Sequence, residues 1–306
     1  MSELLRGAPR AEDALAEVAR CLLCGSEESE LRFEEPPFRV VRCKSCALVW
    51  VTPRRDPSRL VEIYQTAYWH SDAAKDFGYT DYQRDASLYR RTYLRRYSAI
   101  ARHCKTPGEV LDVGCAAGFF LSVMKEKGWR TQGVEVSGYI AEFGRKNYGL
   151  DVIVGTLDEA APVLGDRRFD LITFWDVVEH LPDPIAVLRR AASFLRPGGK
   201  LLLETQNVRS LFARVLGQRW QHYKHHEHLY HFDPRTVREL CRQAGLRVIE
   251  NRARLGGKYV SLGFVRERAG RVHPLLSTLL FPLKLVERSP LYVNLFDEMI
   301  VVCEKA

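Results

Sequence analysis

The stretch Val110-Leu-Asp-Val-Gly-Cys-Ala-Ala-Gly-Phe-Phe120 decides the fold of this chain. Apolar residues run into a turn of glycines and small residues, and residues 119–127 behind it have the composition of a helix. A buried strand, a tight turn and a helix form the first half of a βαβ unit, whose turn lets a ligand lie against bare backbone. About twenty residues later a second strand ends in Glu135, where an acid can accept hydrogen bonds from ribose hydroxyls.

These two features fit two kinds of site, a dinucleotide site and the S-adenosylmethionine (SAM) site of a methyltransferase. The dinucleotide fingerprint requires G-x-G-x-x-G around a pyrophosphate, whereas this turn reads Asp112-Val-Gly-Cys-Ala-Ala-Gly118. The acid before the first glycine is well placed for an ammonium group, which SAM carries and NAD lacks. The turn resembles motif I of the Rossmann-like (class I) SAM-dependent methyltransferases, with Ala116 where that family usually has glycine.

Strands and helices alternate after residue 105, which is typical of a doubly wound α/β sheet. Phe169-Asp170, Val178-Glu-His-Leu181 and Leu195-Arg-Pro-Gly-Gly199 follow in the order and at the spacing of the methyltransferase family. That resemblance implies a seven-stranded Rossmann-like sheet. We expect strands at 109–113, 131–136, 152–154, 169–175, 200–206, 246–253 and 297–304, and helices at 118–127, 138–147, 184–195 and 234–244.

Ligands of such sheets lie at the carboxyl ends of the strands, which places the turn, Glu135 and the end of the fourth strand around one crevice. The family resemblance adds the residues that follow the third strand, near the adenine. The predicted SAM contacts in these segments are Asp112, Gly114, Cys115, Ala116, Gly118, Phe119, Glu135, Val136, Thr156, Leu157, Asp158, Trp175 and Asp176.

Two C-x-x-C knuckles lie near the start of the chain, Cys21-Leu-Leu-Cys24 and Cys43-Lys-Ser-Cys46, with eighteen residues between them. This spacing suits one tetrahedral zinc ion held by all four cysteines, with disulfides and an iron–sulfur cluster as the alternatives. Four thiolates fill the coordination sphere of zinc, so we expect a structural metal and not a catalytic one.

Residues 53–104 are rich in tyrosine, and Tyr89, Tyr93 and Tyr97 fall on one stripe of a helix, a pattern more typical of core than of a pocket. The order of cysteine ribbon, Pro-rich turn, Tyr-rich segment and glycine turn resembles a group of bacterial small-molecule methyltransferases with an N-terminal zinc ribbon, some of which act on sugars. In that group this segment forms a lid over the SAM pocket. The resemblance makes Tyr79 and Tyr82 candidates to contact SAM or the acceptor.

The densest polar cluster is Trp220-Gln-His-Tyr-Lys-His-His-Glu-His-Leu-Tyr-His-Phe232. It is compatible with a general base, a second metal site or a purely structural loop. Related methyltransferases often show Glu-His-Leu-x-x-Phe here, which residues 227–232 match. Neutral imidazole titrates near working pH. The candidate bases are therefore His228 and then His226, with Glu227 orienting its neighbour and His180 lining the same pocket.

These segments divide the chain into a flexible arm (1–20), a zinc ribbon (21–52), a Tyr-rich helical lid (53–104) and a methyltransferase domain (105–306) with insertions at about 207–232 and 256–292. The second insertion contains the apolar segment 274–286, which is too short to span a bilayer. We expect this segment to form a helix that roofs the substrate pocket or makes a dimer face, with a peripheral membrane contact as the alternative. The sequence does not specify the oligomeric state.

Bulk properties set few limits on the partners. The chain has 306 residues and a net charge of +8, with 46% hydrophobic residues, an ordinary globular balance. It has no membrane-length apolar run and no N-terminal signal core, which predicts a cytoplasmic location. The basic charge permits a nucleic-acid partner, but the arginines are scattered, which favours a solvated basic surface.

The leading interpretation is a SAM-dependent methyltransferase that acts on a small-molecule acceptor, by O- or C-methylation of a sugar, polyketide or similar metabolite. An RNA methyltransferase is the first alternative, because some rRNA guanine methyltransferases also join a four-cysteine site to this fold. Against it, Trp175-Asp-Val177 lacks the Pro-Pro-aromatic motif of many base-amine methyltransferases. The second alternative is a non-catalytic SAM-binding scaffold, which the intact glycine turn and Glu135 disfavour.

Overall fold

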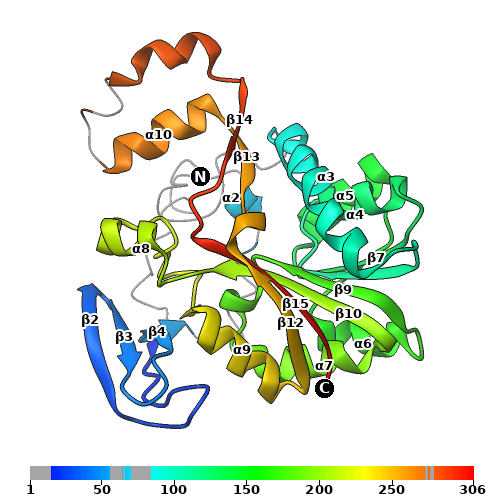
Figure 1. Ribbon diagram of the computed structural model, residues 1–306, viewed down its shortest axis with the longest axis horizontal. Coiled ribbons are helices and arrows are strands. Elements are labelled where there is room, and N and C mark those ends of the chain that lie inside the picture. Colours follow the sequence, from blue (N-terminus) through cyan, green and yellow to red (C-terminus); the bar gives the residue numbers. More distant parts are fainter. Residues whose placement is uncertain (1–14, 56–63, 65, 70–83, 273–274, 276–278) are drawn as a thin grey trace.

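The computed structural model describes residues 15–55, 64, 66–69, 84–272, 275 and 279–306. At its centre is a seven-stranded sheet in the order β12-β15-β10-β9-β6-β7-β8 (Figure 1). Only β15 runs antiparallel to its neighbours. The doubly wound Rossmann-like sheet predicted from the sequence is thus confirmed. Its strands are β6 (Glu109–Val113), β7 (Arg130–Glu135), β8 (Val152–Val154), β9 (Phe169–Trp175), β10 (Leu195–Gln206), β12 (Leu246–Arg252) and β15 (Glu298–Lys305).

Helices cover both faces of the sheet, with α3, α4 and α5 on one side and α6, α7 and α9 on the other (Figure 1). Side-chain caps fix several helix starts, because Asp183 and Asp233 each accept a hydrogen bond from the first turn and precede a proline. The helix bounds are α3 Ala86–His103, α4 Phe119–Glu126, α5 Gly138–Tyr148, α6 Leu157–Leu164, α7 Pro184–Ser193 and α9 Pro234–Gln243.

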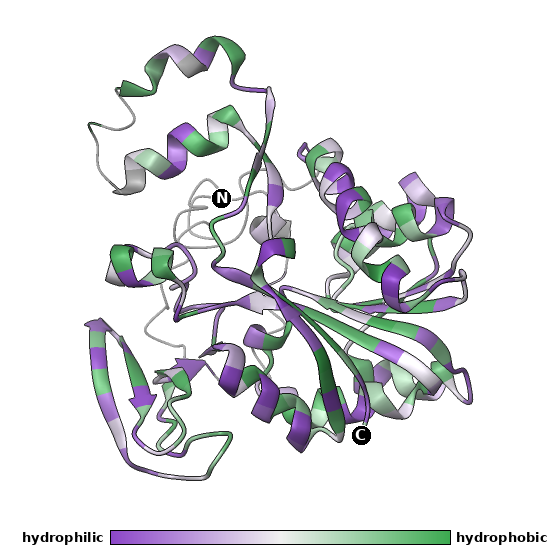
Figure 2. Cartoon of the chain, viewed as in Figure 1, coloured by the Kyte–Doolittle hydropathy of each residue, from purple (hydrophilic) through white to green (hydrophobic). Residues whose placement is uncertain are grey.

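The core lies between the sheet and these helices, and Figure 2 shows hydrophobic residues along the central strands. Leu111, Ile172 and Leu203 lie on three adjacent strands and are fully buried at 0% exposure. Burial of each such side chain contributes about 1.5–3 kcal/mol relative to an exposed one. The scaffold that positions the strand ends is therefore rigid.

The N-terminal ribbon is built from β2 (Ser29–Glu35), β3 (Phe38–Cys43) and β4 (Val49–Thr52). A fourth strand, β11 (Tyr230–His231), comes from the first insertion and pairs with β4 antiparallel. Residues just before the ribbon are also held, because β1 (Leu15–Ala16) pairs with β5 (Arg54–Arg55). The ribbon sheet is therefore completed by a segment distant in the sequence, a pairing that the sequence did not predict.

The remaining short elements lie in the lid segment and the insertions. They are α2 (Thr66–Trp69), α8 (Leu211–Leu216), α10 (Leu262–Val272), β13 (Lys258–Ser261), β14 (Pro290–Val293) and the 3₁₀ helices η2 (Val178–His180), η3 (Gly217–Arg219), η4 (Ala253–Leu255) and η5 (Phe281–Val286). Strands β13 and β14 pair antiparallel in a separate two-stranded sheet beside α10 (Figure 1).

The second half of the helix predicted over 274–286 is the 3₁₀ helix η5 (Phe281–Val286). Pro282 lies in the first turn of η5, where a proline is tolerated because the backbone N–H of that turn has no acceptor within the helix. Residues 274 and 276–278 lie outside the described residues. Leu279 and Leu285 are exposed at 74% and 92%. In the part of the chain that the structure describes, no helix has the length and apolarity to cross a bilayer.

Candidate functional site

The glycine turn after β6 has a backbone that only small residues can adopt. Gly114 and Gly118 have φ of 72° and 74°, and Ala116 has φ of 48°. A Cβ at Gly114 would lie 2.6 Å from Val177 Cγ2, so a larger residue would both strain the backbone and collide. The turn thereby presents bare backbone at the carboxyl end of β6, as the sequence predicted.

Two buried carboxylates flank the turn. Asp112 accepts a hydrogen bond of 2.6 Å from Thr173 Oγ1. Glu135 accepts from the N–H groups of Ala116 and Ser137, each at 2.9 Å. Glu135 thus ties the end of β7 to the turn, and each of its oxygens keeps a further lone pair for a ligand hydroxyl.

The electrostatics of this pair fit a cationic ligand group. Burial and, to a smaller extent, the charge of Glu135 raise the pKa of Asp112 to about 8, although the hydrogen bond from Thr173 lowers it. An ammonium beside Asp112 would offset both effects and favour the ionised form. An open turn, an acid for an ammonium and an acid for ribose hydroxyls together suit SAM, whose amino acid and ribose carry those groups.

The segment after β8 begins α6, a helix that the sequence did not lead us to expect. Thr156 caps it and exchanges hydrogen bonds with Glu159 in a capping box. This Thr-x-x-Glu pattern was a readable signal in the sequence. Leu157 is buried, whereas the Asp158 carboxylate contacts Arg190 at 3.0 Å. The predicted adenine contacts of residues 156–158 stay a prediction.

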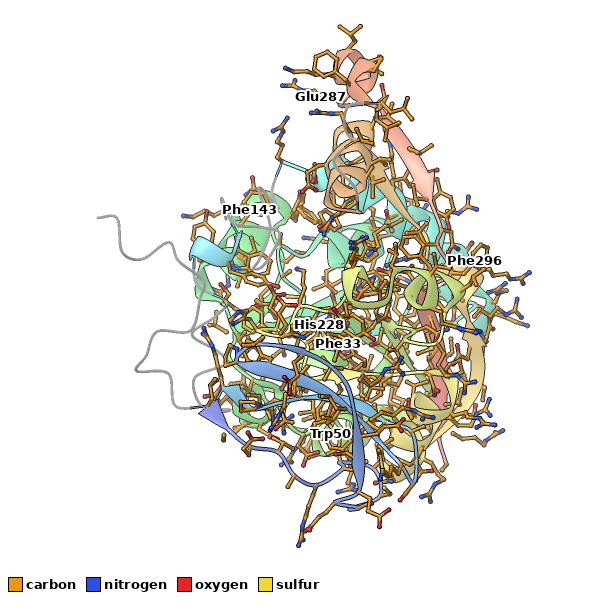
Figure 3. The ribbon with its side chains drawn as sticks, turned by 90° about the vertical axis from the view of Figure 1, so that its left-hand side faces the viewer. Phe33, Trp50, Phe143, His228, Glu287 and Phe296 are labelled. Carbon is orange, nitrogen blue, oxygen red and sulfur yellow. The ribbon has the colours of Figure 1, made fainter. Side chains whose placement is uncertain are left out.

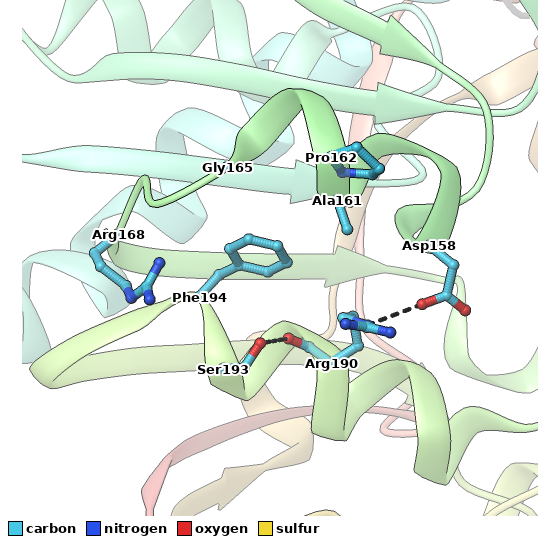
Figure 4. A pocket seen from close by; sticks show the side chains of 8 residues that line it. All are labelled: Asp158, Ala161, Pro162, Gly165, Arg168, Arg190, Ser193 and Phe194. Carbon is cyan, nitrogen blue, oxygen red and sulfur yellow. Dashed lines mark hydrogen bonds and ion pairs between the residues drawn. The ribbon is translucent and has the colours of Figure 1, made fainter.

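Asp158 lines a hollow of about 460 Å³ between α6 and α7 (Figure 4). The lining residues Gly165, Arg168 and Phe194 precede the first residues of β9 and β10. They therefore lie toward the amino edge of the sheet. This hollow is separate from the crevice at the carboxyl ends of the strands, where the predicted site residues gather.

Aromatic side chains from α3 and α4 support the same crevice. Trp175, at the end of β9, packs edge-on to Tyr93 and tilted against Phe120. Phe119 stacks on Tyr89 with ring centroids 5.3 Å apart. The tyrosine stripe of α3 is thus a packing surface, which agrees with the interpretation of the stripe as core. Cys115 is buried in the turn and Val136 is half-buried after β7.

The lid segment reaches the crevice through Tyr64 and α2. Tyr64 Oη lies 3.1 Å from His180 Nδ1, and Tyr68 Oη donates to Glu227 Oε2 at 3.1 Å. Trp69 Nε1 donates to Ser137 Oγ at 3.1 Å, next to the glycine turn. Tyr79 and Tyr82, the predicted lid contacts, lie outside the described residues. The i, i+4 spacing of Tyr64 and Tyr68 was the signal that could have identified this contact.

The histidine loop brings His228 against His180, with ring centroids 4.6 Å apart. His228 Nδ1 lies 2.7 Å from the carbonyl oxygen of His222. A carbonyl can only accept, so Nδ1 carries the proton and Nε2 keeps its lone pair. Burial lowers the pKa of His228 well below its usual range, and nearby His180 and Lys224 lower it further. His228 is therefore a neutral imidazole with its basic nitrogen available.

His226 and His225 turn toward the ribbon and away from His180. His226 packs edge-on against Phe38 with centroids 4.8 Å apart, and His225 Nε2 lies 3.2 Å from Glu35 Oε2. The structure thus brings His228, His180 and Glu227 together and leaves His226 apart from them. Glu227 is buried at 1% exposure and lies 3.4 Å from Lys224 Nζ.

The position of His228 depends on the ribbon. Leu229 accepts a hydrogen bond of 3.0 Å from Val51 in the ribbon, and its N–H donates to the carbonyl of Glu179 at 2.8 Å. Figure 3 shows His228 beside the ribbon sheet that carries Phe33 and Trp50. The backbone next to His228 is thereby fixed from both sides, by β4 and by the turn after β9.

The four ribbon cysteines lie close together, as the sequence predicted. The sulfurs of Cys21 and Cys46 are 3.4 Å apart and those of Cys24 and Cys43 are 3.5 Å apart. All four ligand atoms lie within 4.8 Å of one another. Zinc–sulfur bonds of about 2.3 Å in a tetrahedron require sulfurs about 3.8 Å apart, so the four side chains fit one zinc ion.

Comparison with known proteins gives the family. Residues 82–251, more than half of the chain, match the family described as a methyltransferase domain. The chain belongs to this methyltransferase family. The glycine turn and its two acids, Asp112 and Glu135, fall within the matched residues at the carboxyl ends of β6 and β7.

Curated relatives of the methyltransferase are named ubiquinone biosynthesis O-methyltransferases. The protein of Nitrosospira multiformis is 28% identical over 171 residues, which cover 51% of this chain and 70% of the relative. That of Xanthomonas campestris pv. campestris is 31% identical over 146 residues, covering 42% and 61%. The chain thus matches only part of each relative, and the ribbon has no counterpart in the matched family segment, which begins at residue 82.

A solved structure shares the fold. The Burkholderia thailandensis 1,6-didemethyltoxoflavin-N1-methyltransferase, determined with 1,6-didemethyltoxoflavin and S-adenosylhomocysteine bound, aligns with a TM-score of 0.51. The alignment covers 90% of this chain and 99% of that protein at 14% identity. Identity this low supports the fold and leaves the acceptor to the residues of this chain.

Proposed function

We propose that this methyltransferase transfers a methyl group from SAM to a hydroxyl group of a small-molecule acceptor, with His228 as the general base. SAM supplies, when bound, a methyl group activated by its sulfonium. The protein must orient the acceptor and remove the hydroxyl proton as the new carbon–oxygen bond forms. The observation that carries the proposal is the unprotonated Nε2 of buried, neutral His228, set by the hydrogen bond from Nδ1 to His222.

The surroundings of His228 suit this role. His180 packs across its ring, and Glu227 lies in the same pocket beside Tyr68. The lowered pKa of His228 keeps the imidazole unprotonated at neutral pH. The proton accepted from the acceptor hydroxyl would rest on Nε2 while Nδ1 stays bonded to the His222 carbonyl, so the ring need not rotate during the reaction.

A substitution series tests the base. We expect His228→Ala to lower kcat by ~10² or more, the usual contribution of a positioned base, with S-adenosylhomocysteine affinity unchanged. His228→Asn keeps a donor for the His222 carbonyl but lacks the basic nitrogen, so it should lose activity equally and fold normally. His226→Ala, on the ribbon side, is the matched control and should keep most of the turnover. Full activity of His228→Asn would remove His228 from the mechanism.

A metal site is the second candidate for this pocket, because ligand atoms of Glu179, His180 and His228 lie within 4.8 Å of one another. Two of these groups are engaged elsewhere: Glu179 accepts from Thr205 at 3.0 Å, and His180 contacts Tyr64. The base is therefore favoured. Turnover that needs added Mg²⁺ or Mn²⁺, and that is lost on dialysis against a chelator that leaves the ribbon zinc bound, would favour the metal.

We also propose that the ribbon holds a structural zinc ion through Cys21, Cys24, Cys43 and Cys46. The support is the approach of the four sulfurs to tetrahedral spacing. One zinc ion per chain by elemental analysis, abolished by Cys43→Ser, is the expected result. Iron with visible absorption would instead indicate a cluster.

A further inference from the structure

A second polar cluster lies beside the histidine loop at the same edge of the sheet. It consists of Trp175, Glu204, Glu298, Arg96 and Lys258, and we call it the strand-end cluster. Glu204 is in register with Trp175 on β9, and Gln206, two residues on, is in register with Glu298 on β15. The cluster therefore occupies the carboxyl ends of β9 and β10, next to Asp176.

Ion pairs organise part of the strand-end cluster. Arg96, from α3, donates two hydrogen bonds to Glu204, of 2.6 and 2.5 Å, and its guanidinium lies 5.1 Å from the Trp175 ring. Lys258 Nζ lies 2.5 Å from Glu298 Oε1. Arg96, Glu204 and Glu298 are at most 5% exposed. Buried charges in such pairs need their remaining polar atoms satisfied as well.

Several buried polar atoms of the strand-end cluster have no hydrogen-bond partner. Among the described residues, Trp175 Nε1, Arg96 Nε and Glu298 Oε2 have no hydrogen-bond partner, although each is fully buried. An unpaired buried polar atom costs about 1–3 kcal/mol. Three such atoms in one cluster indicate a binding site for a polar ligand. The first two are donors and the third is an acceptor.

The mixture of orphan groups restricts the chemistry of the ligand. An ammonium ligand would serve Glu298 but leave both donors without partners. A carboxylate or phosphate would be repelled by the negative charges of Glu204, Glu298 and Asp176. An apolar ring would satisfy none of them. Hydroxyl groups donate and accept at once, so a compact group with several hydroxyls satisfies donors and acceptors together.

The cluster also adjoins the proposed base. His222 Nε2 lies 3.5 Å from Glu298 Oε1, and the carbonyl of the same residue accepts from His228 Nδ1. Asp176, between the cluster and the 3₁₀ turn that carries His180, adopts φ of 53°. Such conformations in non-glycine residues concentrate at functional sites. His222 therefore links the strand-end cluster to the proposed base.

We propose that the strand-end cluster is the acceptor subsite and that the acceptor is an uncharged polyhydroxylated group such as a sugar ring. This inference rests on the proposed function, because it names the acceptor of the same reaction. Trp175 and Arg96 donate to acceptor hydroxyl oxygens, and Glu298 accepts from an acceptor hydroxyl. The curated relatives carry O-methyltransferase names from ubiquinone biosynthesis, so the inference separates this chain from them by acceptor class.

Saturation-transfer NMR on the protein saturated with S-adenosylhomocysteine tests the proposal. The probes are the methyl glycosides of glucose, galactose, mannose and rhamnose, with catechol as the aromatic comparison. We expect at least one glycoside to bind, and Trp175→Phe or Glu298→Gln to weaken it about tenfold, the equivalent of one buried hydrogen bond to a charged or well-placed group. Glu304→Gln, at the other end of β15 and paired with Lys200, is the control and should bind like the unchanged protein.

The outcomes separate the two proposals. S-adenosylhomocysteine affinity is measured by calorimetry on each variant. A protein that fails to bind S-adenosylhomocysteine overturns the proposed function. A protein that binds S-adenosylhomocysteine but none of the glycosides, or that binds catechol alone, overturns the acceptor class. Equal glycoside binding by Trp175→Phe, Glu298→Gln and the control overturns the location of the subsite.

Discussion

The glycine turn and the histidine loop both lie at the carboxyl edge of one sheet, yet they are held in place differently. The turn joins a strand to the next helix, and its partner Glu135 follows about twenty residues later, so its geometry comes from one βαβ unit. The histidine loop is held by the ribbon strand β4 on one side and by Glu179 on the other. The glycine turn, the predicted methyl-donor side, is thus local in sequence, and the histidine loop, which carries the proposed base, is assembled from three distant segments.

This difference predicts that donor binding at the glycine turn and turnover at the histidine loop can be lost independently of each other. Glu135→Ala should weaken S-adenosylhomocysteine binding more than 10²-fold, because it removes a buried carboxylate that bonds the turn and that we predict to accept from the ligand ribose. Isothermal titration calorimetry measures this. Glu142→Gln, a half-exposed position on α5, is the control. Binding within threefold of normal after the Glu135 change would show that the turn is held by other contacts.

Loss of the ribbon zinc should disturb the histidine loop and leave donor binding at the glycine turn unchanged. We expect Cys43→Ser to release zinc and lower turnover by ~10²-fold, because a small displacement of a catalytic group has that effect. Donor affinity should stay within a factor of about three, since the turn lies outside the ribbon contacts. Zinc content, turnover and calorimetry are measured on one sample, with Cys104→Ser as the control. Loss of donor affinity together with zinc would contradict the separation.

The histidine side should also make the protein sensitive to acid. Burial lowers the pKa of His180, His225, His226, His228 and His231. Below pH ~6.5 the unfolded chain binds protons that the folded histidines do not, so the free energy of unfolding falls from there down to the folded pKa values. For each histidine, a folded pKa one pH unit below the unfolded value lowers that free energy by about 1.4 kcal/mol. Urea unfolding at pH 5.5 and 7.5, with zinc content followed in the same samples, measures this loss. Equal stability at the two values with zinc retained would contradict it.

Ligand binding at the glycine turn should also depend on pH, through Asp112. Its pKa of about 8 means that the carboxyl is largely protonated at neutral pH. A ligand ammonium would favour the ionised form, so binding of S-adenosylhomocysteine at pH 7 should release a proton. The affinity should then rise by up to about tenfold per pH unit below pH 8. Calorimetry in phosphate and in Tris gives the number of protons released. Asp112→Asn should release none, and equal heats for both proteins would refute the assignment.

The smallest predicted effect is on kcat/KM and concerns Tyr68, the residue of α2 that contacts Glu227 in the histidine loop. Tyr68→Phe removes one hydrogen bond to Glu227. A single neutral donor of this kind contributes about 1 kcal/mol, so kcat/KM should fall about fivefold. Steady-state kinetics measures it, with Tyr97→Phe on α3 as the control. An unchanged kcat/KM would place Tyr68 outside the acceptor pocket.

The contrast between local and distant contacts also determines which features could be predicted from the sequence. The sheet, most of its strands and the turn were predicted, because alternating apolar runs, glycines and caps act within a few residues of each other. The pairing of Trp50 with Tyr230 was not predicted, since no local pattern specifies which distant strand completes a ribbon. The sequence ranked His228 before His226, but the loop backbone decides which of the two rings packs against His180. Helix α6 was a missed local signal.

The pairing of β4 with β11 has a consequence for synthesis of the chain. Residues 49–52 leave the ribosome roughly 180 residues before Tyr230 and His231. At about 5–20 residues per second, the ribbon therefore waits roughly ten to forty seconds for its last strand. During that interval β4 carries an unpaired edge, which is prone to pair with other chains. Early metal capture would keep the nascent ribbon compact until the histidine loop arrives to close it.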